Sequence, residues 1–166
     1  MPLLLSVFIA TTFGLVIHEL GHLLMARCYQ VKALEFGFGV GRRIFRVQLP
    51  RIAFALRIFP FGSFVMLDGT ALAERSLFAQ ILIHLGGVML NLAVGLMTYG
   101  TMFGWINLLL AAGNVLPLYH HDGWKCGVLI IRAFLQRKSQ KAEWAFTFSG
   151  GFVSLLIASL AARVLM

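Results

Sequence analysis

Apolar runs long enough to cross a lipid bilayer make up most of the chain. The first covers residues 3–26, and three more cover residues 77–103, 105–131 and 142–165. A helix of about 24 residues rises about 36 Å, which exceeds the ~30 Å of bilayer hydrocarbon. The pattern predicts an α-helical integral membrane protein with about four transmembrane helices, forming one membrane-embedded core over residues 1–166.

Residues 27–76, between the first two runs, follow a different pattern. Glycines recur in residues 36–41, and apolar residues alternate with arginine in residues 43–48 and 51–59. Such alternation of β-branched and aromatic residues predicts short strands. Because an open sheet edge finds no hydrogen-bond partner in lipid, the strands must lie at the membrane surface or be enclosed by helices. We therefore expect a membrane-associated β-hairpin or small sheet over about residues 33–66.

Composition supports the membrane assignment. Hydrophobic residues make up 60% of the chain and charged residues 12%. A typical soluble domain has about 25% charged residues. The sequence therefore excludes a soluble globule, a disordered chain and a nucleic-acid-binding arm, although the formal net charge is +8.

The basic residues predict how the helices are oriented. Eight of the fourteen lie in residues 27–76, and five more lie near or within the connection between the third and fourth runs. Since cytoplasmic loops carry the excess of Lys and Arg, we expect both connections in the cytoplasm and both termini outside. The prediction is a multi-pass protein of the cell membrane, or of the inner membrane in a Gram-negative bacterium. Its active site would face the cytoplasm, and its surface would contact the lipid bilayer and no nucleic acid.

The first apolar run carries the sequence His18-Glu19-Leu20-Gly21-His22. Residues four apart lie on one face of a helix, so both imidazoles can bind one Zn²⁺ ion, with Glu19 placed as a general base. A chance cluster is a weaker explanation, because a charged side chain at the centre of a bilayer costs about 2.5–3.5 kcal/mol.

Two histidines leave the metal shell incomplete, so a third protein ligand is expected. Asp122 is the best candidate, because it lies where Pro117 and Gly123 interrupt the third run. Helical rise also places it at a depth similar to that of His22. The alternative role for Asp122 is a cap on the helix that follows it. The other candidate ligands in the apolar runs are His84, His120, His121 and Cys126.

Together these motifs resemble the site-2 protease family of intramembrane zinc metalloproteases. The pattern H-E-x-x-H at residues 18–22 is followed by N-x-x-P-x-x-x-x-D-G at residues 114–123, which is similar to the family's N-x-x-P-x-P-x-L-D-G. Residues 36–41 with 56–62 resemble the family's glycine-rich β-hairpin, and residues 86–91 resemble its A-G-P-x-x-N stretch. The resemblance covers essentially the whole chain, and we expect a minimal core without a PDZ or CBS domain.

The chain departs from the family patterns at a few positions. His121 stands where Leu usually precedes the Asp, the second proline is missing, and Trp124 replaces a common Gly. None of these changes removes a proposed ligand or the base.

The resemblance implies hydrolysis of peptide bonds in or near the transmembrane segment of a single-span membrane protein, as in regulated intramembrane proteolysis. Glu19 would take a proton from the attacking water and pass it to the leaving amine. Asn91 and Asn114 are candidates for binding substrate or stabilising the oxyanion. Their alternative roles are an interhelical hydrogen bond for Asn91 and a cap on free carbonyls near Pro117 for Asn114.

The segment 36–66 has two possible roles. An exposed strand edge can pair with extended substrate by β-augmentation. Alternatively, the hairpin anchors the protein at the membrane surface, with arginines at lipid phosphates.

Two other functions remain open. A membrane metalloprotease that cuts soluble peptides usually takes its third ligand from a downstream glutamate, but Glu35 and Glu74 lie outside the apolar runs and Glu143 lies at the very start of the fourth. The second alternative is a catalytically inactive metal-binding core that binds transmembrane helices. Such a core would not need Glu19.

Overall fold

The computed structural model describes residues 2–135 and 140–165. Within them the chain forms a mostly helical structure with a β-hairpin after the first helix, as the sequence predicts. The elements are α1 (Pro2–Cys28), β1 (Ala33–Gln48), β2 (Ala53–Leu67), α2 (Gly69–Ala73), α3 (Leu77–Met97), α4 (Met102–Val115), α5 (Asp122–Phe134) and α6 (Gln140–Leu165).

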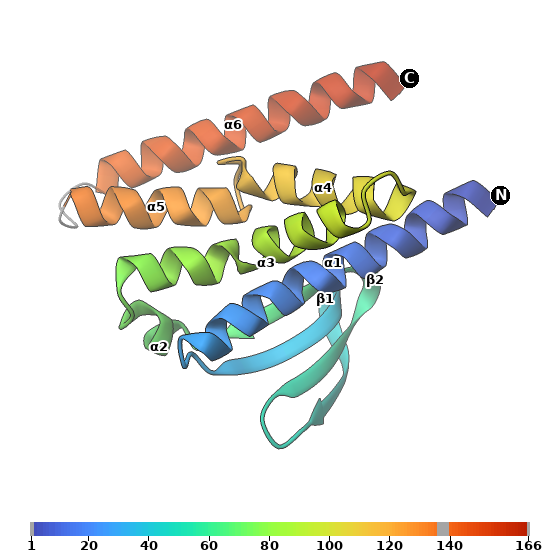
Figure 1. Ribbon diagram of the computed structural model, residues 1–166. Coiled ribbons are helices and arrows are strands. Elements are labelled where there is room, and N and C mark those ends of the chain that lie inside the picture. The colour runs from blue at the N-terminus through green and yellow to red at the C-terminus, as the bar shows by residue number, and fades with distance from the viewer. Residues whose placement is uncertain (1, 136–139, 166) are drawn as a thin grey trace.

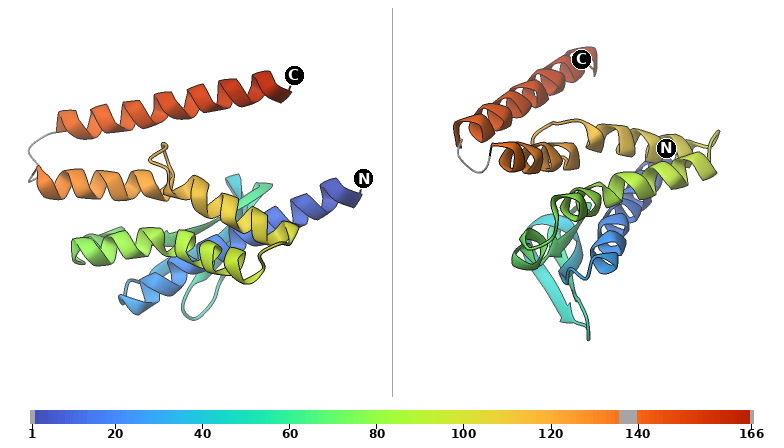
Figure 2. Two further views of the ribbon diagram at one scale, coloured as in Figure 1. Left: turned by 45° about the horizontal axis from the view of Figure 1, so that its top comes forward. Right: turned by 60° about the vertical axis from the view of Figure 1, so that its left-hand side comes forward.

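The long helices lie side by side in the order α1, α3, α4 with α5, and α6 (Figure 1). Helices α4 and α5 lie end to end, and α3 packs against both. Successive members of this series run in opposite directions, and the start of α1 lies at the same end as the end of α6. The hairpin packs on α1, whereas α6 lies at the outer edge against α5 (Figure 2).

Within the described residues, two helices are long and apolar enough to cross a membrane, namely α1 from Leu3 and α3. The predicted second run ends at Met97 and not at residue 103, because Gly100 adopts a φ of 85° in a tight turn. The third predicted run is two helices, since Leu116, which precedes Pro117, is extended and ends α4. At about 1.5 Å per residue, α4 extends only about 21 Å. Helix length and composition therefore support two spanning helices and do not confirm four.

The hairpin consists of two long, bent strands in place of the predicted short ones. Strand β1 turns where Gly39 and Gly41 have φ values of 90° and 89°. As a result, residues 35–38 pair with residues 63–66 on one side and with residues 53–56 on the other. Residues 63–67 therefore form one edge of the sheet.

The α1–α3 crossing depends on glycines that bring the two backbones into contact. A Cβ on Gly21 would overlap the carbonyl of Gly86, and a Cβ on Gly86 would lie 2.8 Å from Met25 Cγ. Small residues allow such close approach of membrane helices. One turn away, Ile83 is fully buried beside Ala26. The register of α1 against α3 is thus fixed around residues 18–26.

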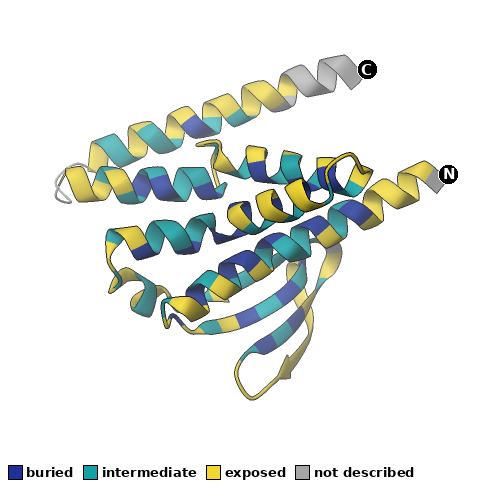
Figure 3. Cartoon of the chain, in the orientation of Figure 1, coloured by how far each residue is buried: buried dark blue, intermediate teal, exposed yellow. Residues whose placement is uncertain are grey.

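Burial is concentrated where α1, α3 and the near part of the hairpin meet (Figure 3). The outer faces of the helices expose large apolar side chains, including Leu4 at 77%, Met97 at 84% and Phe148 at 69%. An apolar surface of this extent is a mark of contact with lipid or another protein.

Candidate active site

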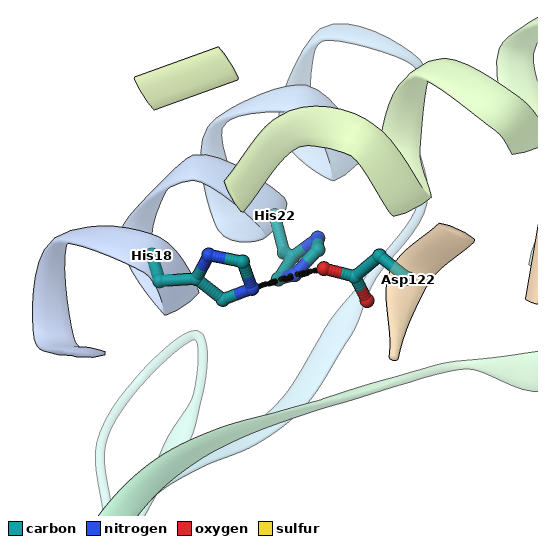
Figure 4. A group of neighbouring side chains, drawn as sticks. All are labelled: His18, His22 and Asp122. Carbon is teal, nitrogen blue, oxygen red and sulfur yellow. Dashed lines mark hydrogen bonds and ion pairs between the residues drawn. The ribbon is translucent and has the colours of Figure 1, made fainter. Parts of the chain in front are cut away.

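Three side chains from two helices converge on one point. His18 and His22 lie one turn apart on α1, and Asp122 is the first residue of α5. Asp122 Oδ2 lies 2.9 Å from His18 Nε2 and 3.1 Å from His22 Nε2, and the two Nε2 atoms are 3.2 Å apart. All three residues are buried, and their polar atoms point toward one another (Figure 4). The structure therefore brings together the two histidines and the carboxylate that the sequence predicts.

This group fits a zinc ion in both chemistry and spacing. Zinc binds imidazole nitrogen and carboxylate oxygen at about 2.0–2.2 Å, which places tetrahedral ligand atoms about 3.3 Å apart. The observed separations of 2.9–3.2 Å lie close to that value. Three protein ligands with a fourth position left for water or substrate are typical of catalytic zinc.

A backbone carbonyl orients the second histidine. His22 Nδ1 lies 2.9 Å from the carbonyl oxygen of Ile83. Because a carbonyl only accepts, Nδ1 carries the proton and Nε2 is left with its lone pair toward the metal position. Such contacts behind a ligand fix its tautomer and ring orientation.

Glycines make room for the ligands. A Cβ on Gly87 would lie 2.6–2.7 Å from three atoms of the His18 ring, so only glycine fits beside His18 in this position. A Cβ on Gly123 would overlap the Val115 carbonyl where α4 and α5 meet. Gly87, within the stretch that resembles A-G-P-x-x-N, therefore has a direct structural role beside a ligand.

Glu19 lies between the metal-binding group and the sheet edge. It lines a cavity of about 490 Å³ together with all three proposed ligands and with residues 64–67 of β2. Its Oε2 accepts a hydrogen bond of 2.9 Å from the backbone N–H of Val65. The proposed base thus faces both the metal position and the backbone of an edge strand.

The two predicted asparagines are placed differently. Asn114 lines the cavity, but its Nδ2 donates to the Leu110 carbonyl at 2.9 Å, which is a local helical contact. Asn91 is fully buried, and its amide atoms have no hydrogen-bond partner among the described residues. It is not among the described residues that line the cavity.

The alternative ligands do not join the metal-binding group in the part of the chain that the structure describes. His84 and His120 line the cavity, and His120 adopts a φ of 71°. His121 is the residue preceding α5, and its Nδ1 is buried without a hydrogen-bond partner among the described residues. The Cys126 thiol instead lies 3.9 Å from the Ile81 carbonyl.

Three groups at the site are not anticipated from the sequence. They are the Ile83 carbonyl, the Val65 N–H and Lys125, whose Nζ lies 2.9 Å from Asp122 Oδ1. The spacing of Lys125, three residues after Asp122 on a helix, is a signal that could have predicted the pair. The two backbone groups leave no mark on the amino-acid pattern.

Comparison with known families gives a match over more than half of the chain. The sequence model of peptidase family M50, the site-2 protease family, matches residues 6–103. The chain belongs to this family. The match contains the H-E-x-x-H motif, the hairpin and α3, but ends before Asp122. It is the structure that brings Asp122 from outside the matched segment to the two histidines.

Relatives in the M50 family include named metalloproteases. The chain is 35% identical over 106 residues to a protein of Thermotoga maritima called "Putative zinc metalloprotease", covering 55% of this chain and 21% of the relative. It is 30% identical over 100 residues to a Helicobacter pylori protein of the same name, covering 52% and 29%. It is 38% identical over 52 residues to the "Regulator of sigma-W protease RasP" of Bacillus subtilis, covering 31% and 12%. The chain is thus similar to part of several proteins named as zinc metalloproteases, and it spans less than a third of these relatives' lengths.

Proposed function

We propose that this M50 chain is an intramembrane zinc endopeptidase that hydrolyses peptide bonds in or near transmembrane segments. The observation that carries the proposal is the convergence of His18, His22 and Asp122 in one cavity with Glu19. The cavity is bounded by apolar helices and by a strand edge, which suits an unwound membrane segment as substrate.

The chain's own residues have distinct tasks in this reaction. His18, His22 and Asp122 would hold one zinc ion, which when bound would supply a Lewis acid for the scissile carbonyl. Glu19 takes the proton of the attacking water and delivers it to the leaving amine. The Val65 N–H binds Oε2 of this carboxylate, so Oε1 can accept from the water, and the N–H becomes available to substrate when its bond to Glu19 opens.

The edge formed by residues 63–67 is the proposed substrate-binding element. Val65 pairs with Phe36 of β1, yet its N–H is directed at Glu19. Successive N–H groups of a strand point to opposite sides, so the outer side of this edge faces the cavity. An extended peptide that adds to this edge by β-augmentation would present its backbone beside Glu19. Pairing there would also hold the substrate in the extended form that hydrolysis requires.

We further propose four membrane crossings, with α4 and α5 together forming the third. Support comes from the end-to-end arrangement of α4 and α5 and from the alternating directions of the helices. The connections at the Cys28 end carry most of the basic residues, which favours a cytoplasmic position for this end by the positive-inside rule. His22 lies five residues before Arg27, so the metal site would open toward the cytoplasmic side.

The test is cleavage of a co-expressed single-span test protein by the wild type and by Glu19→Gln. We expect Glu19→Gln to bind zinc normally and to leave the test protein intact, while the exposed Glu74→Gln control cleaves it like the wild type. A chelator should abolish wild-type cleavage, and added zinc should restore it. Identical fragments from the wild type and Glu19→Gln would show that the chain is instead an inactive metal-binding core.

A further inference from the structure

Two further cavities lie near the Cys28 end of α1, and the first of them shares the lining residue Met66 with the cavity of the metal site. The first, which we name the basic cavity, has a volume of about 690 Å³ and lies on the hairpin. Five cationic side chains line it, and Glu35 is the single carboxylate among its described lining residues. The cationic residues are Lys32, Arg43, Arg46, Arg51 and Arg57.

The charges in the basic cavity are only partly compensated. Buried Glu35 pairs with Arg43 at 3.0 Å and with Arg46 at 3.4 Å. Arg51 and Lys32 have no carboxylate partner among the described residues. An anion that enters the cavity would therefore meet several cations and one carboxylate that is already neutralised.

Arg57 is held in place without an anion. Its guanidinium carbon lies 4.1 Å from the centre of the Phe64 ring, and its Nε is buried with no hydrogen-bond partner in the described part of the chain. Stacking on an aromatic ring fixes the plane of a guanidinium while leaving its outer N–H groups available. A preoriented arginine of this kind is suited to bind phosphate.

An apolar groove adjoins the basic cavity. The groove has a volume of about 650 Å³ and runs between the last turns of α1, including Leu23 and Arg27, and Ile52 in the β1–β2 turn. The groove and the basic cavity share four residues, which form a common rim: Lys32, Ala33, Pro50 and Arg51.

We propose that the basic cavity and the apolar groove together bind one anionic glycerophospholipid. Arg51, Lys32 and Arg57 contact the phosphate, and an acyl chain lies in the groove along Leu23 and Ile52. The groove favours a lipid over an acidic peptide or a free phosphate, because it continues the charged site into an apolar channel beside a membrane-spanning helix. Basic pockets at the cytoplasmic ends of such helices suit lipid headgroups.

The experiment is a titration of the detergent-solubilised, zinc-loaded protein with dioleoylphosphatidylglycerol or dioleoylphosphatidylcholine, followed by native mass spectrometry. We expect selective binding of phosphatidylglycerol. The double variant Arg51→Gln/Arg57→Gln should weaken it about 30-fold, since each cation near the surface contributes about 1 kcal/mol. The charge-matched control Arg42→Gln/Lys141→Gln, outside both cavities, should bind within about twofold of the wild type. Zinc content reports whether each variant is folded, and Arg51→Lys/Arg57→Lys should restore most of the binding.

Three further measurements separate the lipid from other anions. Ile52→Asn should weaken phosphatidylglycerol binding, and free glycerol phosphate should bind far more weakly than the lipid. The proposal is overturned if phosphatidylcholine or glycerol phosphate binds as tightly as phosphatidylglycerol, or if the control loses as much affinity as the double variant. Tight binding of an acidic peptide that the lipid cannot displace would identify the cavity as a peptide site and would also overturn it.

Discussion

Lys125 Nζ lies 2.9 Å from Oδ1 of Asp122, while Oδ2 of the same carboxylate lies 2.9 Å from His18 Nε2. One oxygen is therefore held within α5, and the other points across to α1. This arrangement leaves Oδ2 directed at the two histidines, where it would bind the metal. It also supplies the cation that a buried carboxylate needs.

Replacement of Lys125 should weaken zinc binding without removing a ligand. For Lys125→Met we expect the zinc dissociation constant to rise about 10–100-fold, as is usual when a partner behind a ligand is lost. The measurement is competition for zinc against a chromophoric chelator in detergent. Lys141→Met, at an exposed position of α6, is the control. Unchanged zinc affinity in Lys125→Met would mean that the ion pair has no role in metal binding.

The contact between Gly87 and His18 predicts a strong effect from one methyl group. Gly87→Ala places a Cβ 2.6–2.7 Å from the imidazole, so the ring must move away from Asp122. We expect zinc affinity to fall about tenfold or more. Gly113→Ala adds the same methyl group in α4 where no atom lies within 4 Å, and should be neutral or stabilising by up to about 1 kcal/mol. Equal zinc binding by both variants would contradict the position of His18.

The proposed substrate edge can be tested at one backbone N–H. Val65→Pro removes that donor, and proline is tolerated on an edge strand where the N–H lies outside the ladder. We expect cleavage of the test protein to fall about tenfold or more, with zinc content unchanged, because an edge hydrogen bond to substrate is lost. Val65→Ala keeps the N–H and should retain activity. Faster cleavage by Val65→Pro would instead indicate that the Val65–Glu19 contact only restrains the base.

The two cysteines report the proposed orientation. Cys28 ends α1 and is exposed, whereas Cys126 is buried. A membrane-impermeant maleimide should therefore label the protein in inside-out vesicles and not in spheroplasts. Cys28→Ser should abolish the labelling. Labelling of Cys28 in spheroplasts would show that the topology is the reverse of the one proposed.

Much of the site can be predicted from the sequence because polar residues stand out in apolar helices. Glu19 and Asp122 are two of only six carboxylates, and both lie within apolar runs. The helical period then places His18 and His22 on one face. The hairpin is also visible in the sequence, since its alternation differs from the runs around it.

The remaining features depend on contacts that no local pattern encodes. A carbonyl such as that of Ile83 belongs to every residue type, and its role follows from the α1–α3 register. Hydropathy also merges α4 and α5 into one run, although Leu116 before Pro117 separates them. Asn91 has the polarity expected of a site residue, but it is buried away from the described cavity lining.

His18 and Asp122 are 104 residues apart in the chain, so an ion bound to both closes a very long loop. A covalent cross-link over about 100 residues would lower the entropy of the unfolded chain by an amount equivalent to about 4.7 kcal/mol. Zinc in this position would act partly as such a cross-link between the N-terminal helix and the C-terminal half. Metal content would then govern how long the protein survives in the cell as well as whether it cleaves.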